Sequence, residues 1–514
     1  MAFARQTVVV AGAHVDNATV GAIHYAALAG GPNARVLFIK KTVKCNVFAL
    51  FPNRHQQIGG TSTNVFGTTK NTWKLSRVGD YITSTWFRFQ LSSVARAAAL
   101  NVAGSTQYLR WTHNLAHNLV RNIDLSFTQV TANTMDEFFF DFFAAFSVPG
   151  GKRNAYDNMI GNVPELVNPA VAITVAGNAQ VLPAAILNLP VPQPYTRDVG
   201  VALPSGALIY NEVEITVDFR DWTELLVVSN ASGAAAVPAV PAMTANMSRQ
   251  ATTADVITAP TVSADLWSTY ALVTTDERKR MGKVPRDIVW EIVQTMQDTS
   301  VLAGSTTIET PLRYSNAVKN LFFAIKNNTV PSDHSNYTSR VPLARSVANP
   351  GAGVGASLTL LEFPSPGAFD AVGSVTILYE GVTKVGDDMP IDYFSLIQPF
   401  YYGRSIPTVT GYHMYSYSLD MVSTDSLGST DYGKLTNVSI RFTLSADAQS
   451  ALAGTVPAPL PFFDENGVLS PLPAPYASLL GVGVNNINMT AAGAFDLPAQ
   501  RFVTMKNRFA HTIL

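Results

Sequence analysis

Two histidines have the spacing of a zinc-protease helix. His113 and His117 stand four residues apart, so on a helix both imidazoles would lie on one face. In zinc proteases the residue after the first histidine is a glutamate that acts as general base, and here it is Asn114. A lone pair of histidines without a carboxylate partner lacks the support that metal sites need. We therefore interpret them as polar residues of a strand or loop.

The other candidate constellations are also incomplete. The glycine-rich segment 351–355 is not followed by the Lys-Ser or Lys-Thr of a phosphate-binding loop. Cys45 has only His55 nearby, which is no evidence for a catalytic dyad. The carboxylate pairs 276–277 and 387–388 are flanked by basic residues or turn formers, as expected of solvated faces. We predict no catalytic, cofactor-binding or metal-ligating residue.

Seven Asn-x-Ser/Thr sequences occur, and without a secretory signal we attribute them to composition rather than to glycosylation. They begin at Asn17, Asn230, Asn246, Asn327, Asn336, Asn437 and Asn488.

The composition excludes several classes of protein. Only 14% of the 514 residues are charged, where about 25% is usual, and the formal net charge is -1. Such a chain lacks the basic surface that a nucleic-acid binder needs. Cys45 is the only cysteine, so no intrachain disulfide can form, and a reducing compartment fits best. The uncharged stretch 225–248 contains two prolines and a glycine, which makes it a poor membrane-spanning helix.

Alternation of apolar and polar residues predicts β-strands in both halves of the chain. Val213 to Phe219 is the clearest, with one face wholly apolar and the other wholly polar, as in a sheet that packs on a core. The other strands are predicted at 81–91, 123–127, 375–379 and 438–444. Turn residues punctuate these runs at short intervals, which leaves little room for crossover helices. The chain is predicted to be mostly antiparallel β.

Helices are expected only as insertions. Thr134 and Glu137 form the pattern of a capping box, which predicts a helix over Met135 to Phe146, and a second short helix is expected over Arg153 to Ile160. The stretch 138–146 holds six phenylalanines. Because each ring buries a large area, we interpret this stretch as a packing cap over a sheet end rather than a ligand site.

The order of segments repeats. In the first half, strand 213–219 is followed by an Ala/Pro-rich excursion at about 231–263 and then by the apolar run 266–273. In the second half, strand 438–444 is followed by a Pro-rich excursion at about 446–476 and then by the apolar run 479–484. The repetition indicates two similar β domains in tandem.

Several strings, kept in the same order along the chain, resemble the major capsid proteins of the nucleocytoplasmic large DNA viruses, most closely the iridovirus-like branch. They are Arg110-Trp111-Thr112 with His117-Asn118, Tyr156 to Asn162, Asp276 to Arg280, Tyr401 to Pro407 and Gly428 to Asn437. The resemblance runs from about residue 71 to the C-terminus. It departs from the family pattern at Asp431, where an asparagine is usual.

The resemblance implies an all-β fold of two tandem eight-stranded antiparallel jelly rolls with short helical insertions in loops. It places the last strand of the first jelly roll at 266–275 and the first strand of the second at 287–295. The expected domains are an N-terminal arm at 1–60, a first jelly roll at 61–282 and a second at 283–514.

The implied function is that of a structural major capsid protein without enzymatic activity. Homotrimers would form pseudo-hexagonal capsomers that tile the icosahedral shell of a large double-stranded DNA virus. The expected partners are neighbouring capsomers, minor capsid proteins and an inner membrane beneath the shell, with no direct contact to nucleic acid. Two alternatives stay open, a β-sandwich virion protein that binds glycans or a receptor, and a β hydrolase. The first would bind as a monomer, and the second would lose activity when one carboxylate is neutralised.

Overall fold

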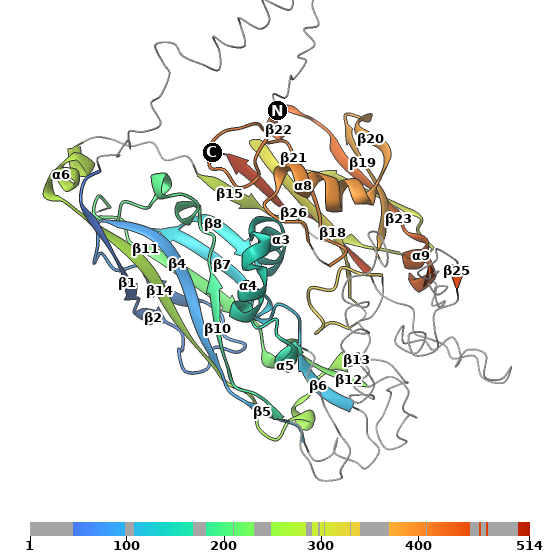
Figure 1. Ribbon diagram of the computed structural model, residues 1–514, viewed down its shortest axis with the longest axis horizontal. Coiled ribbons are helices and arrows are strands. Elements are labelled where there is room, and N and C mark those ends of the chain that lie inside the picture. Colours follow the sequence, from blue (N-terminus) through green and yellow to red (C-terminus); the bar gives the residue numbers. More distant parts are fainter. Residues whose placement is uncertain are drawn as a thin grey trace, which may run out of the picture. The chain divides into compact units, whose positions relative to one another are not determined.

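The computed structural model describes residues 45–97, 107–167, 181–208, 210–230, 248–283, 290–296, 299–302, 304–328, 330–339, 370–407, 409–452, 462–463, 469–470 and 502–513. Within this part of the chain the strands pair in antiparallel fashion throughout (Figure 1). The fold is therefore all-β, as the alternation predicts.

The first half forms two facing sheets of the jelly-roll type. One sheet has the order β1-β14-β4-β10 and the other the order β2-β3-β11-β7-β8. Their strands are β1 (Phe48–Arg54), β2 (Gln57–Gly59), β3 (Asn71–Lys74), β4 (Tyr81–Leu91), β7 (Val120–Phe127), β8 (Val130–Asp136), β10 (Ala185–Pro190), β11 (Val213–Phe219) and β14 (Val262–Val273). Short strands β5 (Val94–Ala95), β6 (Gln107–Trp111), β9 (Val181–Leu182), β12 (Leu226–Asn230) and β13 (Ser248–Gln250) extend its loops.

The second half repeats this arrangement. One sheet has the path β15-β26-β18-β21 and the other the order β17-β23-β19-β20. The strands are β15 (Glu291–Gln294), β17 (Thr307–Leu312), β18 (Ala317–Asn327), β19 (Val372–Tyr379), β20 (Val382–Pro390), β21 (His413–Ser416), β23 (Val438–Leu444) and β26 (Phe502–Ile513). Short strands β16 (Thr299–Ser300), β22 (Thr430–Asp431), β24 (Phe462–Phe463) and β25 (Leu469–Ser470) are additional.

The two halves have the same strand order. With β2 and the short strands set aside, each half has eight strands, and the first, eighth, third and sixth form one sheet while the second, seventh, fourth and fifth form the other. The predicted tandem of two eight-stranded jelly rolls is thus confirmed. The predicted strands at 213–219 and 438–444 are the seventh strand of each half, which lies inside its sheet and alternates between buried and less buried residues.

One predicted boundary needs correction. β1 and β2 belong to the sheets of the first half, because β1 pairs with β14 along its whole length, so the first jelly roll begins before residue 61. Part of the excursion 231–263 is ordered as β13, which pairs with β12. The apolar run 479–484 lies outside the described residues, and the eighth strand of the second half that the structure describes is β26.

The helices lie in loops, as predicted, but one begins differently. They are α2 (Leu115–Leu119), α3 (Glu137–Ser147), α4 (Arg153–Ile160), α5 (Pro164–Val167), α6 (Thr275–Lys283), the π-helix η7 (Tyr393–Ile397), α8 (Gln398–Tyr402) and α9 (Ala446–Leu452). The predicted capping box is wrong, since Thr134 lies in β8 and its hydroxyl donates to Asp124. Asp136 caps α3 by accepting from the amide of Phe139 (3.0 Å). Glu137 is buried in an ion pair with Arg220 instead.

Two apolar cores stabilise the described chain. The second core lies between the two sheets of the second half and includes Leu321, Phe323 and Phe442. The first core fills the first half and continues onto the second half through Phe322 and Met414. Residues of β18 therefore alternate between the two cores, and this strand joins the two halves.

Candidate functional site: the junction between the two jelly rolls

The aromatic residues of α3 pack the first half onto the second. The Phe142 ring centroid lies 6.2 Å from that of Phe322 on β18, 5.2 Å from that of Tyr337 and 5.1 Å from that of Tyr412. Phe146, one turn further along α3, stacks on Phe322 at 5.6 Å. The phenylalanine-rich stretch is thus a packing cap, as the sequence predicts, but it covers a face of the sheet that contains β18 in the other jelly roll rather than a sheet end (Figure 1).

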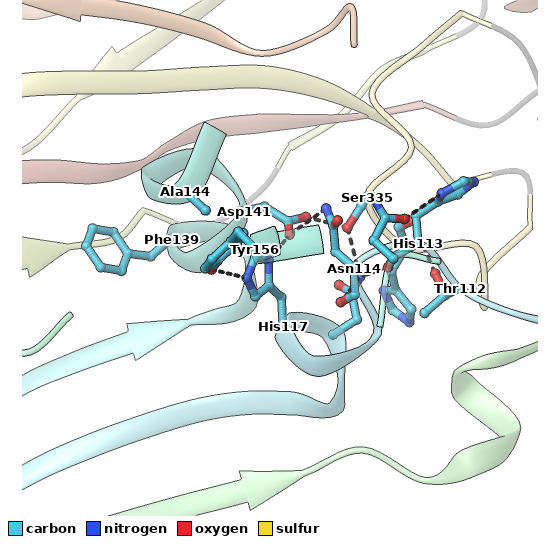
Figure 2. A network of polar contacts seen from close by, with 12 residues as sticks. Thr112, His113, Asn114, His117, Phe139, Asp141, Ala144, Tyr156 and Ser335 are labelled. Atoms are coloured by element: carbon cyan, nitrogen blue, oxygen red, sulfur yellow. Dashed lines mark hydrogen bonds and ion pairs between the residues drawn. The ribbon is translucent and has the colours of Figure 1, made fainter. Parts of the chain in front are cut away.

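A single carboxylate inside this aromatic helix collects four donors (Figure 2). Asp141 Oδ1 accepts from His117 Nδ1 (2.6 Å) and Asn114 Nδ2 (3.0 Å). Asp141 Oδ2 accepts from the Ser335 hydroxyl and from the Tyr337 hydroxyl (3.1 Å), both in the second half. The Asp141 side chain is fully buried, so these bonds replace its hydration. The carboxylate therefore fastens the loop 330–339 to α2 and α3.

His117 links this carboxylate to Tyr156 of α4. A carboxylate can only accept, so Nδ1 of His117 carries the proton, and Nε2 then accepts from the Tyr156 hydroxyl at 2.7 Å. Burial raises the pKa of Tyr156 above its ordinary value, and the nearby Asp141 adds to this. The phenol consequently keeps its proton. Asp141, His117 and the Tyr156 hydroxyl are linked in the order of a catalytic triad. The hydroxyl nevertheless acts as a hydrogen-bond donor and not as an activated nucleophile.

A second group of polar bonds holds the same loop from the other side. Arg110 on β6 pairs with Asp333 at 3.2 Å, and both side chains are buried. Thr112 donates to the carbonyl of His334 (3.2 Å), and Asn118 donates to the hydroxyl of Ser335 (2.8 Å). The loop 330–339 thus has polar partners in the first half at three consecutive residues.

His334 is buried as a neutral ring. Burial lowers the pKa of His334 well below its usual range, and the adjacent Lys326 and Arg220 lower it further. Nδ1 lies 3.3 Å from Lys326 Nζ, which only donates, and Nε2 lies 3.1 Å from the carbonyl of Glu224. The neutral tautomer with its proton on Nε2 satisfies both neighbours. This histidine is a structural tie between the jelly rolls.

A third polar contact between the two halves involves Glu291 on β15. Lys319 on β18 pairs with Glu291 at 2.5 Å, and Arg197 of the first half lies 3.9 Å from the other oxygen of Glu291. The guanidinium of Arg197 also stacks over the ring of Phe143, with 3.9 Å to the centroid. Burial lowers the pKa of Arg197, and Glu291 opposes that effect. Buried pairs of this kind need exact partners, so they favour one orientation of the two halves over others.

The structure separates the two histidines singled out by their spacing. His113 precedes α2 and its Nδ1 lies 3.4 Å from Asn162 Oδ1, whereas His117 is on α2 and bonds to Asp141. Asn114 adopts a left-handed conformation (φ 50°) at the start of α2 and so breaks the helical spacing. Across the described residues, no group of three or more His, Cys, Asp or Glu side chains is placed to hold a metal ion.

The other candidates are dispersed. Cys45 is exposed, while His55 is buried and accepts at Nδ1 from the amide of Ser76 (3.2 Å). The pair 276–277 lies on α6 and the pair 387–388 on β20, and the segment 351–355 lies outside the described residues.

Two of the glycosylation sequences are buried, at Asn327 and Asn336, and that at Asn437 is exposed. Asn17, Asn246 and Asn488 lie outside the described residues, as does the side chain of Asn230. None of the helices in the described ranges is long and apolar enough to cross a membrane.

Sequence reasoning missed Asp141 and the loop 330–339. One signal was available, because a lone aspartate among six phenylalanines needs buried partners if the helix is a core element. No local pattern shows that Ser335 and Tyr337, almost two hundred residues away, supply them.

Comparison with known proteins agrees with this architecture. The family profile described as major capsid protein N-terminus matches residues 36–271, and that described as large eukaryotic DNA virus major capsid protein matches residues 277–459. The major capsid protein of Invertebrate iridescent virus 6 is 37% identical over 473 residues, covering 91% of this chain and 94% of the relative. That of Frog virus 3 (isolate Goorha) is 38% identical, covering 82% and 85%.

Solved capsid structures share the fold. The PBCV-1 virus capsid protein superposes with a TM-score of 0.61 at 17% identity, covering 93% of this chain and 96% of that one. The Faustovirus major capsid protein gives a TM-score of 0.58 at 11% identity, covering 81% and 90%. With its two like jelly rolls and relatives that match almost their whole length, the chain belongs to the major capsid proteins of large eukaryotic DNA viruses, and it is a structural component of the virion.

Proposed function

We propose that this major capsid protein assembles as a homotrimer whose three chains form one pseudo-hexagonal capsomer. The observation that carries the proposal is that two jelly rolls with one strand order occur in each chain and are tied by buried polar bonds. Three such chains around an axis present six similar units, which is the shape of a tile with nearly hexagonal outline. Such tiles would cover the faces of an icosahedral shell.

The low charge of the chain supports extensive contacts between copies. Only 14% of the residues are charged, and the centres of obligate interfaces are depleted of charge. The further partners we propose are neighbouring capsomers, minor capsid proteins and an inner membrane beneath the shell. Direct binding of DNA is not proposed, since the net charge is -1. Assembly in the host cytoplasm is consistent with a single unpaired cysteine.

We further propose domain limits and the absence of catalysis. The strand pairing supports a first jelly roll from 48 to 282 and a second from 283 to 514, preceded by an arm. We infer no enzymatic activity, because the Asp141, His117 and Tyr156 side chains are all engaged in buried bonds with one another, and Asp141 also bonds to the second half. The glycan-binding or receptor-binding alternative is not favoured, since the relatives that match this chain nearly end to end are major capsid proteins.

Sedimentation velocity at low micromolar concentration tests the trimer. We expect a single species near three times the chain mass of 55.2 kDa that persists on dilution. Obligate interfaces of about 2,000 Å² or more make this resistance to dilution the expected behaviour. A monomer at every concentration would contradict the proposal.

A further inference from the structure

The two jelly rolls carry a helix at the same place in their topology. In the first half, α3 lies in the connection between the fifth and sixth strands, β8 and β10. In the second half, η7 and α8 lie in the connection between the fifth and sixth strands, β20 and β21. The two insertions are therefore equivalent under the repeat that relates the jelly rolls.

The first of these helices, α3, packs on a sheet of the second half. Phe142 and Phe146, four residues apart on α3, contact Phe322 at the centre of the sheet β15-β26-β18-β21. Phe322 belongs to the core of the first half, while its neighbours Leu321 and Phe323 belong to the core of the second, so the covered face is the outer face of that sheet.

The second helix packs Phe394 into the core of its own half and presents three other apolar residues to solvent. Ile397 and Tyr401, again four residues apart, are 46% and 68% exposed, and Phe400 is 66% exposed. The rings of Phe400 and Tyr401 contact each other edge to face at 5.1 Å, so they form one continuous apolar surface. A contiguous exposed patch of large apolar side chains marks an interaction site.

In the second half α3 covers Phe322. At the equivalent position, the sheet of the first half carries a pair of aromatic residues. On the third strand β18, Phe322 pairs with Met414 of the sixth strand and with position 509 of the eighth. On the third strand β4, Trp86 pairs with Pro190 of the sixth strand and with Trp267 of the eighth. Trp86 and Trp267 point to the outer face, are only partly buried, and stack with centroids 6.4 Å apart.

We propose that Ile397, Phe400 and Tyr401 of one copy pack on the outer face of the sheet β1-β14-β4-β10 of a second copy, over Trp86 and Trp267. Within the described residues α3 lies on the outer face of a sheet of the other half, whereas Ile397, Phe400 and Tyr401 stay exposed and the outer face over Trp86 and Trp267 stays partly exposed. The exposed helix surface and the partly exposed sheet face differ from each other, so the contact is head to tail, and a rotation of one third of a turn between copies closes it into the trimer. This surface rests on the trimer proposed above.

The exposed patch adjoins the contact that already exists within the chain. The amides of Arg404 and Ser405, just after α8, donate to the carbonyl of Phe146 at the end of α3 (2.9 and 3.1 Å). Tyr402 packs partly into the first core, while Tyr401 beside it faces solvent. The interface between copies would thus continue the junction between the jelly rolls.

Removing the two exposed rings tests the surface. The double variant Phe400→Ser with Tyr401→Ser should raise the dissociation constant of the trimer by roughly a hundredfold, because aromatic anchors dominate interface energies. The matched control is Tyr210→Ser, since Tyr210 is 91% exposed and lies on neither proposed face. Circular dichroism should show the same folded spectrum for wild type and both variants.

Thiol cross-linking tests the pairing of the two faces. In a Cys45→Ser background, F400C together with R88C should give a ladder ending at the trimer when treated with a bismaleimide, because Arg88 lies beside Trp86 on the outer side of β4. F400C alone and R88C alone should remain single chains on a denaturing gel.

The outcomes separate this surface from the trimer itself. A trimeric wild type combined with an unweakened double variant, or with no cross-link between F400C and R88C, would overturn the surface and leave the trimer standing. Cross-linked dimers of F400C alone would also overturn it, because they indicate a two-fold contact. A monomeric wild type would refute the trimer and this surface together.

Discussion

The third strands of the two jelly rolls, β4 and β18, have the same place in the topology but different patterns of burial. β18 is buried at every residue after its first, while β4 alternates between buried residues and partly buried or exposed ones. The difference arises because α3 covers the outer face of the sheet that contains β18. Burial along a strand therefore reports what covers each face of its sheet, and the fold of the sheet alone does not determine it.

The covered strand β18 also contains buried charged side chains that need partners. Two lysines of β18, Lys319 and Lys326, are buried, and each has a partner from another segment, Glu291 and His334 respectively. Burying a charge without such a partner is costly, and both partners belong to the second half. Lys326 also lies over the ring of Phe138 on α3, 5.1 Å from its centroid, so one of the two lysines has a contact with the first half as well.

The sharpest way to test this contrast is to truncate one ring on each of the two equivalent helices. Phe142→Ala should lower the free energy of unfolding by about 3–5 kcal/mol, because it leaves a cavity among buried rings. This loss should be the same at every protein concentration. Tyr401→Ala should lower the unfolding midpoint only at concentrations where the trimer forms, since the ring is exposed in the single chain.

Thermal unfolding followed at several concentrations of both variants is the measurement. An equal loss for Tyr401→Ala at all concentrations would show that this ring already has a partner within the chain, and the contrast between the two helices would then disappear.

Asp141→Asn tests the polar half of the junction. One carboxylate oxygen becomes an amide nitrogen, which cannot accept from the donors now aimed at it, namely His117 and Asn114 on one side or Ser335 and Tyr337 on the other. We expect a loss of about 2–3 kcal/mol in the free energy of unfolding, the usual cost of leaving buried donors unpaired.

The matched control is Asp387→Asn on β20, where the carboxylate is exposed and the change should stay within about 0.5 kcal/mol. Denaturant unfolding of both variants gives the comparison. Equal effects at the two sites would mean that the carboxylate at the junction does not hold the halves together.

The last prediction concerns pH. Burial lowers the pKa of His55 in the first half to about 4. In the unfolded chain a histidine titrates near 6.5, so the unfolded state takes up the proton first as the pH falls. The stability that His55 contributes is therefore present above about pH 6.5 and is lost between that pH and about 4.

His55→Gln should flatten this part of the stability curve, measured as the unfolding midpoint between pH 7 and pH 4 in wild type and variant. An unchanged slope would mean that His55 ionises in the folded state as readily as in the unfolded state.

Strands whose residues alternate between apolar and polar were predictable from the sequence, and the continuously apolar strand β18 was not. Val213 to Phe219 and Val438 to Leu444 alternate strictly enough to identify one buried face. The central run of β18, Leu321 to Ile325, is continuously apolar, and periodicity cannot distinguish such a run from a buried helix. The capping-box error at Thr134 has a related cause, because pairing with β7 extended β8 to Asp136 and moved the helix start.

Local pattern and composition determined that this chain is β-rich, that it repeats itself, that it is poor in charge and that its ordered strings match a capsid family. These properties follow from residues close together in sequence. Only the tertiary structure decided that Asp141 would meet Ser335 and Tyr337, and that α3 would be covered while α8 stays exposed. Those outcomes depend on which distant surfaces approach one another, and the free energy of a buried contact is set by its partner as much as by the residue itself.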